Sequence, residues 1–219
     1  MKKYELTAEF IEKWGKKLFR IKALISFGNV EAGELGGYVE KEDNLAQDDN
    51  AWVHGNARVF GNARVCDDAE VCGNARVFGN AEVLGNARVL GNARVFDDAE
   101  VCDDAEVFGN ARVYGDARVC GNARVYGNAR VYGDADYLLI GRIGSRFSFT
   151  TFFKNKDKGI TVSCGCFLGT IAEFRAKVSD THGNNKHAKI YNLAADMAEL
   201  QILGEEHFEN LNTNKSEPF

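Results

Sequence analysis

One six-residue phrase, G-N-A-R-V-x, repeats without insertion from Ala51 to Ala135. Fourteen valines lie six residues apart between Val53 and Val131, each two positions after an alanine. A repeat this short cannot bury a core by itself, so successive copies must stack on one another. The sequence therefore predicts a solenoid in which every outward position recurs at a fixed place on a surface.

Each phrase predicts a short strand followed by a corner. Along A-R-V-x, Ala and Val alternate inward while Arg and the variable residue point outward. The G-N pair supplies the corner, because Gly and Asn tolerate the left-handed backbone region. Asp67, Asp97 and Asp103 replace Gly at three corners, and we expect these turn-competent residues to preserve the corner.

The residue types after the valines separate into three classes when they are compared every eighteen residues, which predicts a three-sided parallel coil. One face is aromatic throughout, and an arginine precedes each of its valines. This Arg–aromatic face consists of Arg58, Arg76, Arg94, Arg112 and Arg130 with Phe60, Phe78, Phe96, Tyr114 and Tyr132.

The other two faces differ in chemistry. One alternates acidic and basic residues and predicts a ladder of cross-strand ion pairs, formed by Glu70, Arg88, Glu106 and Arg124. The other carries a row that we interpret as packing residues, namely Cys66, Leu84, Cys102 and Cys120.

Three parts of the chain resemble known proteins. The repeated phrase resembles the left-handed parallel β-helix of the hexapeptide-repeat superfamily, which implies a left-handed coil. Gly36-Gly-Tyr-Val-Glu40 is similar to the N-terminal cap of bacterial and prophage hexapeptide-repeat proteins. Ile143-Gly-Ser-Arg146, Cys164-Gly-Cys-Phe167 and Thr181-His-Gly183 resemble a C-terminal module of phage-encoded proteins. These resemblances imply a fold and a phage or prophage setting, but no reaction.

We therefore expect a mainly β protein with four segments. Residues 1–50 form a cap and residues 51–136 the three-sided β-helix, because a bare first coil would expose unpaired backbone. Residues 137–203 form a small α+β module, and residues 204–219 a flexible tail.

The C-terminal module is predicted to contain three strands and two helices. The strands are expected at Tyr137–Ile143, Arg146–Phe153 and Ile160–Phe167. Thr170-Ile-Ala-Glu173 is a capping box that begins the first helix, and Thr181–Asn185 ends it. A second helix is expected from Lys186 to Leu203, since four apolar residues recur there at helical spacing: Ile190, Leu193, Met197 and Leu200.

Charge and composition limit the partners. The net charge is −5, so any surface that binds anions must be local. Duplex nucleic acid fits poorly, because strands ~4.8 Å apart do not follow a ~3.4 Å base-pair rise. We see no signal peptide, lipidation motif or membrane-spanning run, and we expect a protein of the host cytoplasm with reduced thiols. Apolar rows outside the coil predict a homo-oligomer, a trimer or a dimer.

Two candidate sites stand out. The stacked arginines of the Arg–aromatic face repel one another, so an anionic partner, a second subunit or the folded-back C-terminal module could cover them. In the C-terminal module, basic and hydroxyl residues could bind a small anionic, nucleotide-like ligand. These residues are Arg146, Thr150, Thr151, Lys158 and His182.

Metal and cofactor sites are not expected. Cys164 and Cys166 would lie on one side of a strand, and His182 and His187 could join them around zinc. Their spacing is not that of a standard zinc finger, and buried cysteine is common in protein cores.

We predict a non-catalytic phage or prophage accessory protein, with the β-helix as a rigid assembly surface and the C-terminal module recognising an anionic ligand or a host protein. The first alternative is an acyltransferase of the hexapeptide type. It is disfavoured because the coil has a single histidine, His54, and no inserted loop. The second alternative is a polymer-forming structural protein, which non-repeat segments at both ends disfavour.

Overall fold

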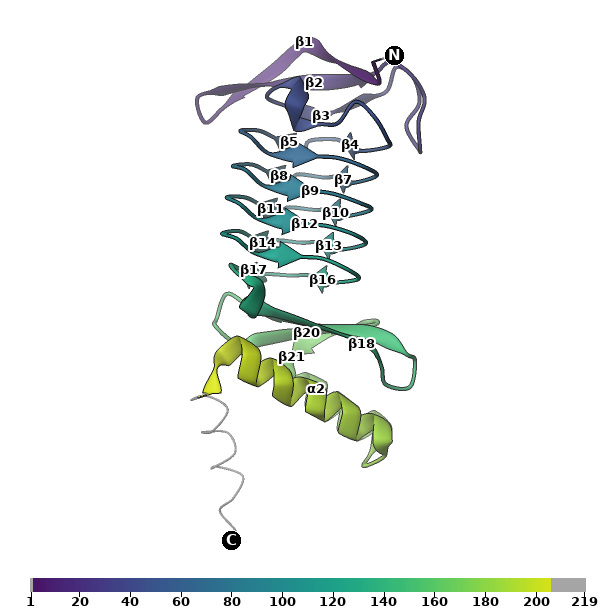
Figure 1. Cartoon of the computed structure of the whole chain (residues 1–219), viewed down its shortest axis with the longest axis vertical. Helices are drawn as coiled ribbons and strands as arrows, with labels where there is room; N and C mark the ends of the chain where they lie inside the picture. The colour runs from purple at the N-terminus through teal and green to yellow at the C-terminus, as the bar shows by residue number, and fades with distance from the viewer. Residues whose placement is uncertain (1, 206–219) are drawn as a thin grey trace. The chain divides into compact units, whose positions relative to one another are not determined.

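The computed structural model describes residues 2–205 and divides into two compact units, one ending at Asn128 and one beginning at Ala129. The architecture is mainly β, with a parallel β-solenoid followed by an antiparallel sheet and two helices (Figure 1). This confirms the fold class predicted from the period. The left-handed sense of the coil stays a prediction from resemblance.

Each solenoid strand is two residues long and ends at the valine of its phrase. The strands of the Arg–aromatic face in the first unit are β5 (Arg58–Val59), β8 (Arg76–Val77), β11 (Arg94–Val95) and β14 (Arg112–Val113). Those of the ion-pair face are β4 (Trp52–Val53), β7 (Glu70–Val71), β10 (Arg88–Val89), β13 (Glu106–Val107) and β16 (Arg124–Val125). Those of the cysteine-bearing face are β6 (Arg64–Val65), β9 (Glu82–Val83), β12 (Glu100–Val101) and β15 (Arg118–Val119).

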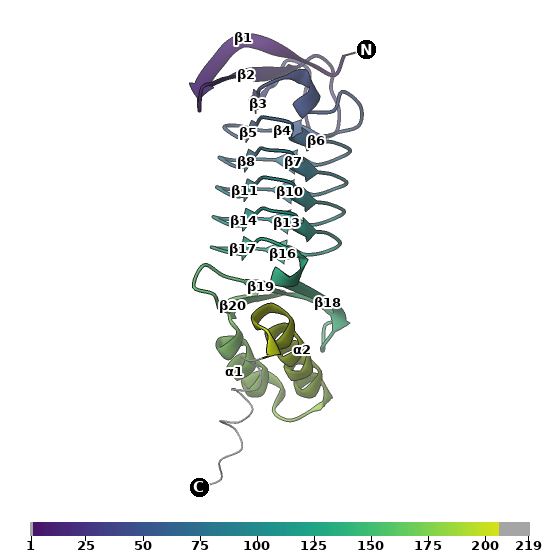
Figure 2. The same ribbon diagram turned by 60° about the vertical axis from the view of Figure 1, so that its left-hand side comes forward.

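Strands eighteen residues apart pair in parallel and in register, as the eighteen-residue recurrence of residue types predicted. Arg94 lies opposite both Arg76 and Arg112, and Glu106 lies between Arg88 and Arg124. The three columns of strands stack one rung above another (Figure 2). The inward alanines and valines are fully or almost fully buried in every rung, so the core is a narrow column of small and branched side chains.

The corners use the left-handed backbone region. Asp67, Asp97 and Asp103 have φ angles of 58°, 61° and 57°, which confirms that aspartate preserves the corner. Gly79 shows why glycine prevails elsewhere: its φ is +77°, and a Cβ there would lie 2.8 Å from the backbone nitrogen of Asp97. Adjacent rungs are thus too close at this corner for most side chains.

Charged side chains join the rungs on the ion-pair face. Arg88 Nε donates to Glu70 at 3.2 Å, and Arg124 Nη2 donates to Glu106 at 2.9 Å. The predicted ladder is therefore confirmed. On the cysteine-bearing face, Cys102 and Cys120 form a disulfide between neighbouring rungs. The expectation of packing thiols is wrong for this pair, because in-register stacking brings their side chains together.

The cap extends the sheet of the Arg–aromatic face. It consists of β1 (Tyr4–Lys13), β2 (Lys16–Ala23), β3 (Leu35–Val39) and the 3-10 turn η1 (Glu42–Asn44). β1 and β2 form an antiparallel hairpin, β2 pairs with β3, and β3 pairs in parallel with β5. The cap therefore occupies the edge that end-to-end stacking of solenoids would need.

The second unit begins with the last phrase of the repeat, whereas the sequence placed the boundary after residue 136. It contains β17 (Arg130–Val131), η2 (Asp134–Asp136), β18 (Tyr137–Ile143), β19 (Ser148–Lys154), β20 (Ile160–Cys164), β21 (Phe167–Thr170), α1 (Ile171–His182) and α2 (Lys186–Leu203). Ala129 forms a bridge with Asn155, and Lys154 Nζ lies 2.7 Å from Asp136 Oδ1. These contacts tie the last phrase to the hairpin of β19 and β20.

The two helices begin and end close to their predicted positions. Thr170 accepts from the Glu173 backbone at the start of α1, and Glu173 Oε2 accepts from Thr170 N, so the capping box is confirmed. One helix face differs from expectation. The core of this unit buries the alanine-rich side of α2, and the apolar stripe that identified the helix is exposed. Within residues 2–205, neither helix is both long and apolar enough to cross a bilayer.

The predicted tail lies almost wholly outside the described residues, which end two positions into it at Glu205.

Candidate functional site

A cavity of about 190 Å³ lies in the C-terminal module, between the turn after β18, the turn from β20 to β21, and both helices. Its polar lining includes Ser145, Arg146, Ser148, Cys164, Cys166, Lys177, Thr181 and His182. Its apolar lining consists of Phe167, Phe174, Val178 and the ring of Tyr191. The cavity therefore combines an apolar floor with polar groups at its rim.

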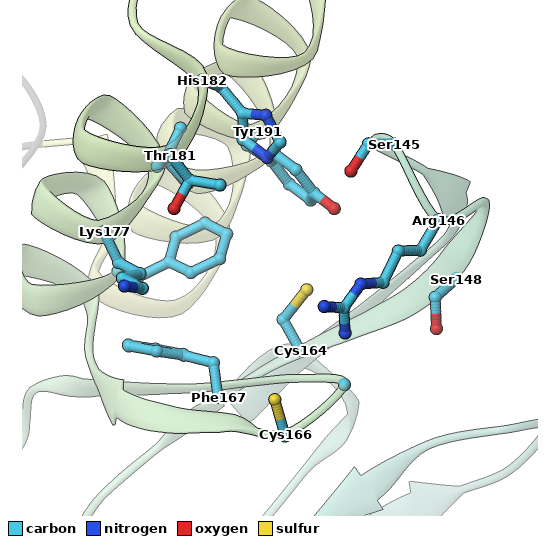
Figure 3. Close-up of a pocket in the computed structure, with 13 residues that line it drawn as sticks. Ser145, Arg146, Ser148, Cys164, Cys166, Phe167, Lys177, Thr181, His182 and Tyr191 are labelled. Carbon is cyan, nitrogen blue, oxygen red and sulfur yellow. The ribbon is translucent and has the colours of Figure 1, made fainter.

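Two tight turns position the polar side chains. Gly144, with φ +72°, lies so close to α2 that a side chain there would overlap the hydroxyl group of Tyr191. Arg146 follows two residues later, and its guanidinium group extends across the cavity toward Cys164 (Figure 3). Gly165, with φ +60°, forms the turn between β20 and β21, and a Cβ there would lie 3.6 Å from Arg146 Nη1.

The cavity lining is electropositive. Arg146 and Lys177 carry positive charge, and no carboxylate of residues 2–205 lines the cavity. Within residues 2–205, Arg146 makes neither an ion pair nor a hydrogen bond. Lys177 has only an exposed neighbour in Asp180, 3.6 Å away. An anion that entered the cavity would meet two cationic side chains, and it would compete with the exposed carboxylate of Asp180 for Lys177 alone.

Hydrogen-bonded and stacked neighbours surround the residues that line the cavity. Thr150 Oγ1 donates to Cys164 Sγ at 3.2 Å. The ring centroid of His182 lies 5.8 Å from the ring centroid of Tyr191 and 5.9 Å from that of His187. Burial, and to a smaller extent the neighbouring Cys164, raises the pKa of Tyr191 to about 12, so its hydroxyl stays protonated at neutral pH and can donate.

The structure brings two of the five predicted ligand-binding residues together, Arg146 and His182. Thr150 and Thr151 lie on β19, are buried, and do not line the cavity. Lys158 lies beyond the far end of β19, a strand of seven residues that separates it from Arg146 by roughly 20 Å at ~3.3 Å per residue.

Sequence reasoning missed Lys177 as a site residue. Lys177 could have been found from its spacing on α1: it lies three residues after Phe174 and four before Thr181, and residues three to four apart share one helix face. On that side of α1, Phe174 and Val178 are buried, whereas the side chain of Lys177 is exposed.

The expectation of two thiols on one side of a strand is wrong. β20 ends at Cys164, and Cys166 lies in the two-residue turn with Gly165, because the positive φ of Gly165 reverses the chain there. Within residues 2–205, Cys164, Cys166, His182 and His187 do not bring three ligand atoms within 4.8 Å of one another. Among the described residues, the one set that does so is Glu100 with Cys102 and Cys120, and it contains the disulfide.

A second cavity, of about 210 Å³, lies in the first unit beside His54. It is also lined by Asn50, Trp52, Asp68 and Glu70. Asn50 Nδ2 donates to Asp68 at 2.7 Å. Within residues 2–205, no hydrogen bond joins the His54 ring to either carboxylate. The geometry therefore places the histidine of the acyltransferase alternative in a cavity but gives it no orienting partner.

The Arg–aromatic face forms a continuous stack in the first unit. Phe60, Phe78, Phe96 and Tyr114 follow one another with centroids 5.0, 4.9 and 5.0 Å apart and planes within 9° of parallel. The arginines run beside them in register. Burial and the guanidinium groups of Arg94 and Arg58 lower the pKa of Arg76. Within residues 2–205, no salt bridge involves any of these arginines.

The cap covers one end of this face. Trp14, in the turn between β1 and β2, stacks on Phe60 with centroids 4.9 Å apart. The guanidinium carbon of Arg76 lies 4.9 Å from the Trp14 ring centroid. The expected cover was a second subunit or the C-terminal module, and the hairpin was not anticipated. Arg94, Arg112 and their aromatic neighbours lie beyond it.

The fold and its ladders define a repeat β-solenoid protein. In agreement, residues 105–121 and 123–135 match the model of a family described as the YdcK Beta solenoid repeat. The match lies in the last turns of the solenoid, and the description of the family names no reaction or ligand. A comparison with curated proteins gives no match.

Proposed function

We propose that this chain is a non-catalytic accessory protein in which the solenoid is a rigid support and the C-terminal module binds a small organic anion. The observation that carries the proposal is the guanidinium group of Arg146, which makes no hydrogen bond or ion pair within the described residues. It lies with Lys177 and His182 around a cavity that no carboxylate of residues 2–205 lines. A phage or prophage setting is proposed on the resemblance of the cap and of the C-terminal module.

Cavity size and lining indicate the ligand class. A volume of about 190 Å³ is below the roughly 300–1,000 Å³ of pockets that enclose drug-sized molecules. An apolar cavity of about 150 Å³ can hold benzene. The cavity therefore suits a ring-sized apolar body that carries one phosphate or carboxylate group, and it is too small for a whole nucleotide.

Arginine suits the anionic end of such a ligand. Its planar fork donates two parallel hydrogen bonds to a phosphate or carboxylate. The rings of Phe167, Phe174 and Tyr191 would contact the apolar end. Within residues 2–205, no serine or cysteine of the cavity is hydrogen-bonded to His182. This arrangement binds and orients a ligand without a nucleophile paired with a general base.

Titration calorimetry with phenyl phosphate, benzoate and inorganic phosphate tests the proposal. We expect phenyl phosphate or benzoate to bind more tightly than inorganic phosphate, and Arg146→Ala to weaken binding at least tenfold. Arg146→Lys should bind with intermediate affinity, because it keeps the charge and loses the fork. Arg142→Ala is the matched control, an exposed arginine of β18 that does not line the cavity.

Equal loss of binding in the Arg142 and Arg146 variants, or no binding of any of the three anions, would contradict the proposal.

A second binding surface is favoured by the uncompensated charge of the Arg–aromatic face. Its rings stack on one another, so their faces are occupied and nucleic acid bases cannot stack between them. Ring edges carry partial positive charge, and the guanidinium groups beside them carry a full positive charge. We therefore propose an acidic polypeptide segment as the partner of Arg94 and Arg112.

Fluorescence anisotropy with labelled poly-glutamate and oligo-thymidine separates the two classes of polyanion. Arg94→Ser with Arg112→Ser should abolish binding of poly-glutamate and leave the cavity ligand unaffected. Arg88→Ser with Arg124→Ser removes the same charge from the ion-pair face and should change binding little. Preference for oligo-thymidine would refute the acidic-peptide assignment.

A further inference from the structure

Helix α2 is apolar on two sides. One side is buried in the core of the C-terminal module through Ala188, Tyr191, Ala195, Ala198 and Ile202, which pack with Phe152, Val162 and Phe174. The other side carries Ile190, Leu193, Met197 and Leu200, which are 38%, 63%, 56% and 45% exposed. We call these four residues the α2 seam.

The core of the module does not need the seam. A helix packed on one globular core carries one apolar stripe, and its opposite side is normally polar. In α2 the exposed side carries four large apolar side chains, whereas alanines make up most of the buried apolar residues, beside Tyr191 and Ile202. Exposed apolar groups arranged contiguously indicate a surface that another molecule covers.

The spacing of the seam identifies the kind of partner. The intervals are three, four and three residues, which is the a/d pattern of paired helices. Ile190 and Met197 occupy a positions, and Leu193 and Leu200 occupy d positions. Of the two a residues, Ile190 is β-branched and Met197 is not, and a β-branched residue at a with leucine at d favours two parallel strands. At ~1.5 Å per residue the seam is about 15 Å long, enough to align two helices that are already folded.

The flanks of the seam are compatible with a parallel pair of identical helices. Lys189 and Asp196 take the g positions. Of the two e residues, Gln201 is exposed and can face the second helix, whereas Ala194 is buried in the core of its own module. No like charges meet in this arrangement. Asp196 is also neutralised within its own subunit, where its carboxylate lies 2.7 Å from Arg175.

The remaining chain is a poor match for the seam. Fourteen residues follow Glu205, and apart from Pro218 their apolar side chains are Phe208, Leu211 and Phe219, without an a/d repeat. An identical helix supplies four matching apolar residues, and the tail does not.

We infer that the α2 seam pairs two copies of this chain in parallel to form a dimer. The earlier expectation of a trimer or a dimer is thereby narrowed to a dimer, and its interface moves from the solenoid faces to the last helix. The proposal is independent of anion binding, because the cavity lies on the opposite, core-facing side of α2, where Tyr191 points.

Analytical ultracentrifugation of the full chain over a range of concentrations tests the inference. The wild-type chain should sediment as a dimer that dissociates on dilution. Leu193→Gln with Met197→Gln should be monomeric with an unchanged circular dichroism spectrum, because both side chains are exposed. Leu168→Gln is the control, an exposed leucine of β21 outside the seam, and it should remain dimeric.

A monomeric wild type at every concentration, a trimer, or a dimer insensitive to the double substitution would each overturn the inference. Removal of residues 205–219 tests the tail as occupant: the dimer should persist, and a dimer that appears only after truncation would overturn the assignment to a second copy. Leu193→Cys should cross-link under mild oxidation beyond the wild-type level, because d positions meet in a parallel pair. Failure to cross-link would refute the parallel arrangement.

Discussion

Arg76 lies over the ring of Trp14, with its guanidinium carbon 4.9 Å from the ring centroid, and Trp14 in turn stacks on Phe60. Forty-six positions in the chain separate Trp14 from Phe60, yet the turn of the β1–β2 hairpin places Trp14 against Phe60, the first aromatic residue of the Arg–aromatic face. Trp14 has φ 52° and Gly15 φ 73°, as a tight two-residue turn requires. This contact fastens the cap to the solenoid.

Trp14→Ala should therefore destabilise the cap. It removes one stacked ring contact and one cation–π contact, and we expect a loss of about 1–2 kcal/mol in the free energy of unfolding. Chemical denaturation of the wild type and the variant measures the difference. Leu24→Ala, a similarly exposed apolar residue, is the control and should stay within about 0.5 kcal/mol. Equal losses in the two variants would contradict the role of Trp14.

The corner at Asp103 predicts losses of stability of different size for two small substitutions. Its φ is 57°, and its Oδ2 accepts from Gly121 N at 2.9 Å. Asp103→Ala loses the hydrogen bond and keeps the backbone strain, so we expect a loss of about 1–2 kcal/mol. Asp103→Gly relieves the strain and should be closer to neutral. Thermal unfolding of both variants checks the order, and a more stable alanine variant would be inconsistent with it.

Lys3 predicts a rise of stability with pH. Its ammonium group is buried and donates to the carbonyl oxygens of Asp48 and Ala51 at 2.9 and 3.0 Å. Burial lowers the pKa of Lys3 from 10.5 to about 8. Between these values the unfolded chain binds more protons than the folded one, so this group adds stability as pH rises from about 8 to 10.5.

The measurement is the difference in unfolding free energy between the wild type and Lys3→Met across that pH window. The comparison with the variant is needed because Tyr4, whose pKa burial raises, contributes in the opposite direction above pH 10. The wild type should gain stability relative to the variant as pH increases. A flat difference would show that folding leaves the pKa of Lys3 at its ordinary value, and a difference that falls with pH would show that folding raises it.

The acyltransferase alternative predicts an activity that we do not expect. Purified protein should transfer no acetyl group from acetyl-CoA to amine or hydroxyl acceptors, because His54 has no hydrogen-bonded carboxylate within the described residues to orient it as a general base. A thiol-release assay measures this. If the protein turns over acetyl-CoA and His54→Ala abolishes that turnover, the protein is an enzyme and the proposal of a non-catalytic accessory protein is wrong.

Much of the solenoid could be predicted from the sequence, because its interactions link identical positions eighteen residues apart. Once the period is known, the pairing of Glu106 with Arg124 and the stacking of Phe78 on Phe96 follow from register alone. The aspartate corners and the capping box at Thr170 are similarly local, since each depends on the backbone of a few adjacent residues.

The candidate cavity could be predicted only in part. Arg146 and His182 were identified from residue type, whereas Thr150, Thr151 and Lys158 were placed with them through nearness in sequence alone. Alternation along β19 buries the threonines, and the length of that strand carries Lys158 away. Cys166 was assigned to a strand because a glycine turn two residues long leaves almost no signal in a short apolar run.

The sequence by itself determined the period, the three faces and the residues that each face presents. The physical reason is that stacking at a fixed interval makes residues eighteen positions apart neighbours in space. Tertiary structure alone decided that Trp14 covers the first rung of the Arg–aromatic face and that Lys177 joins Arg146 at the cavity. It also decided which of two apolar sides of α2 enters the core. Such choices depend on packing between segments far apart in the chain, and helical spacing gives both sides of α2 the same periodic signal.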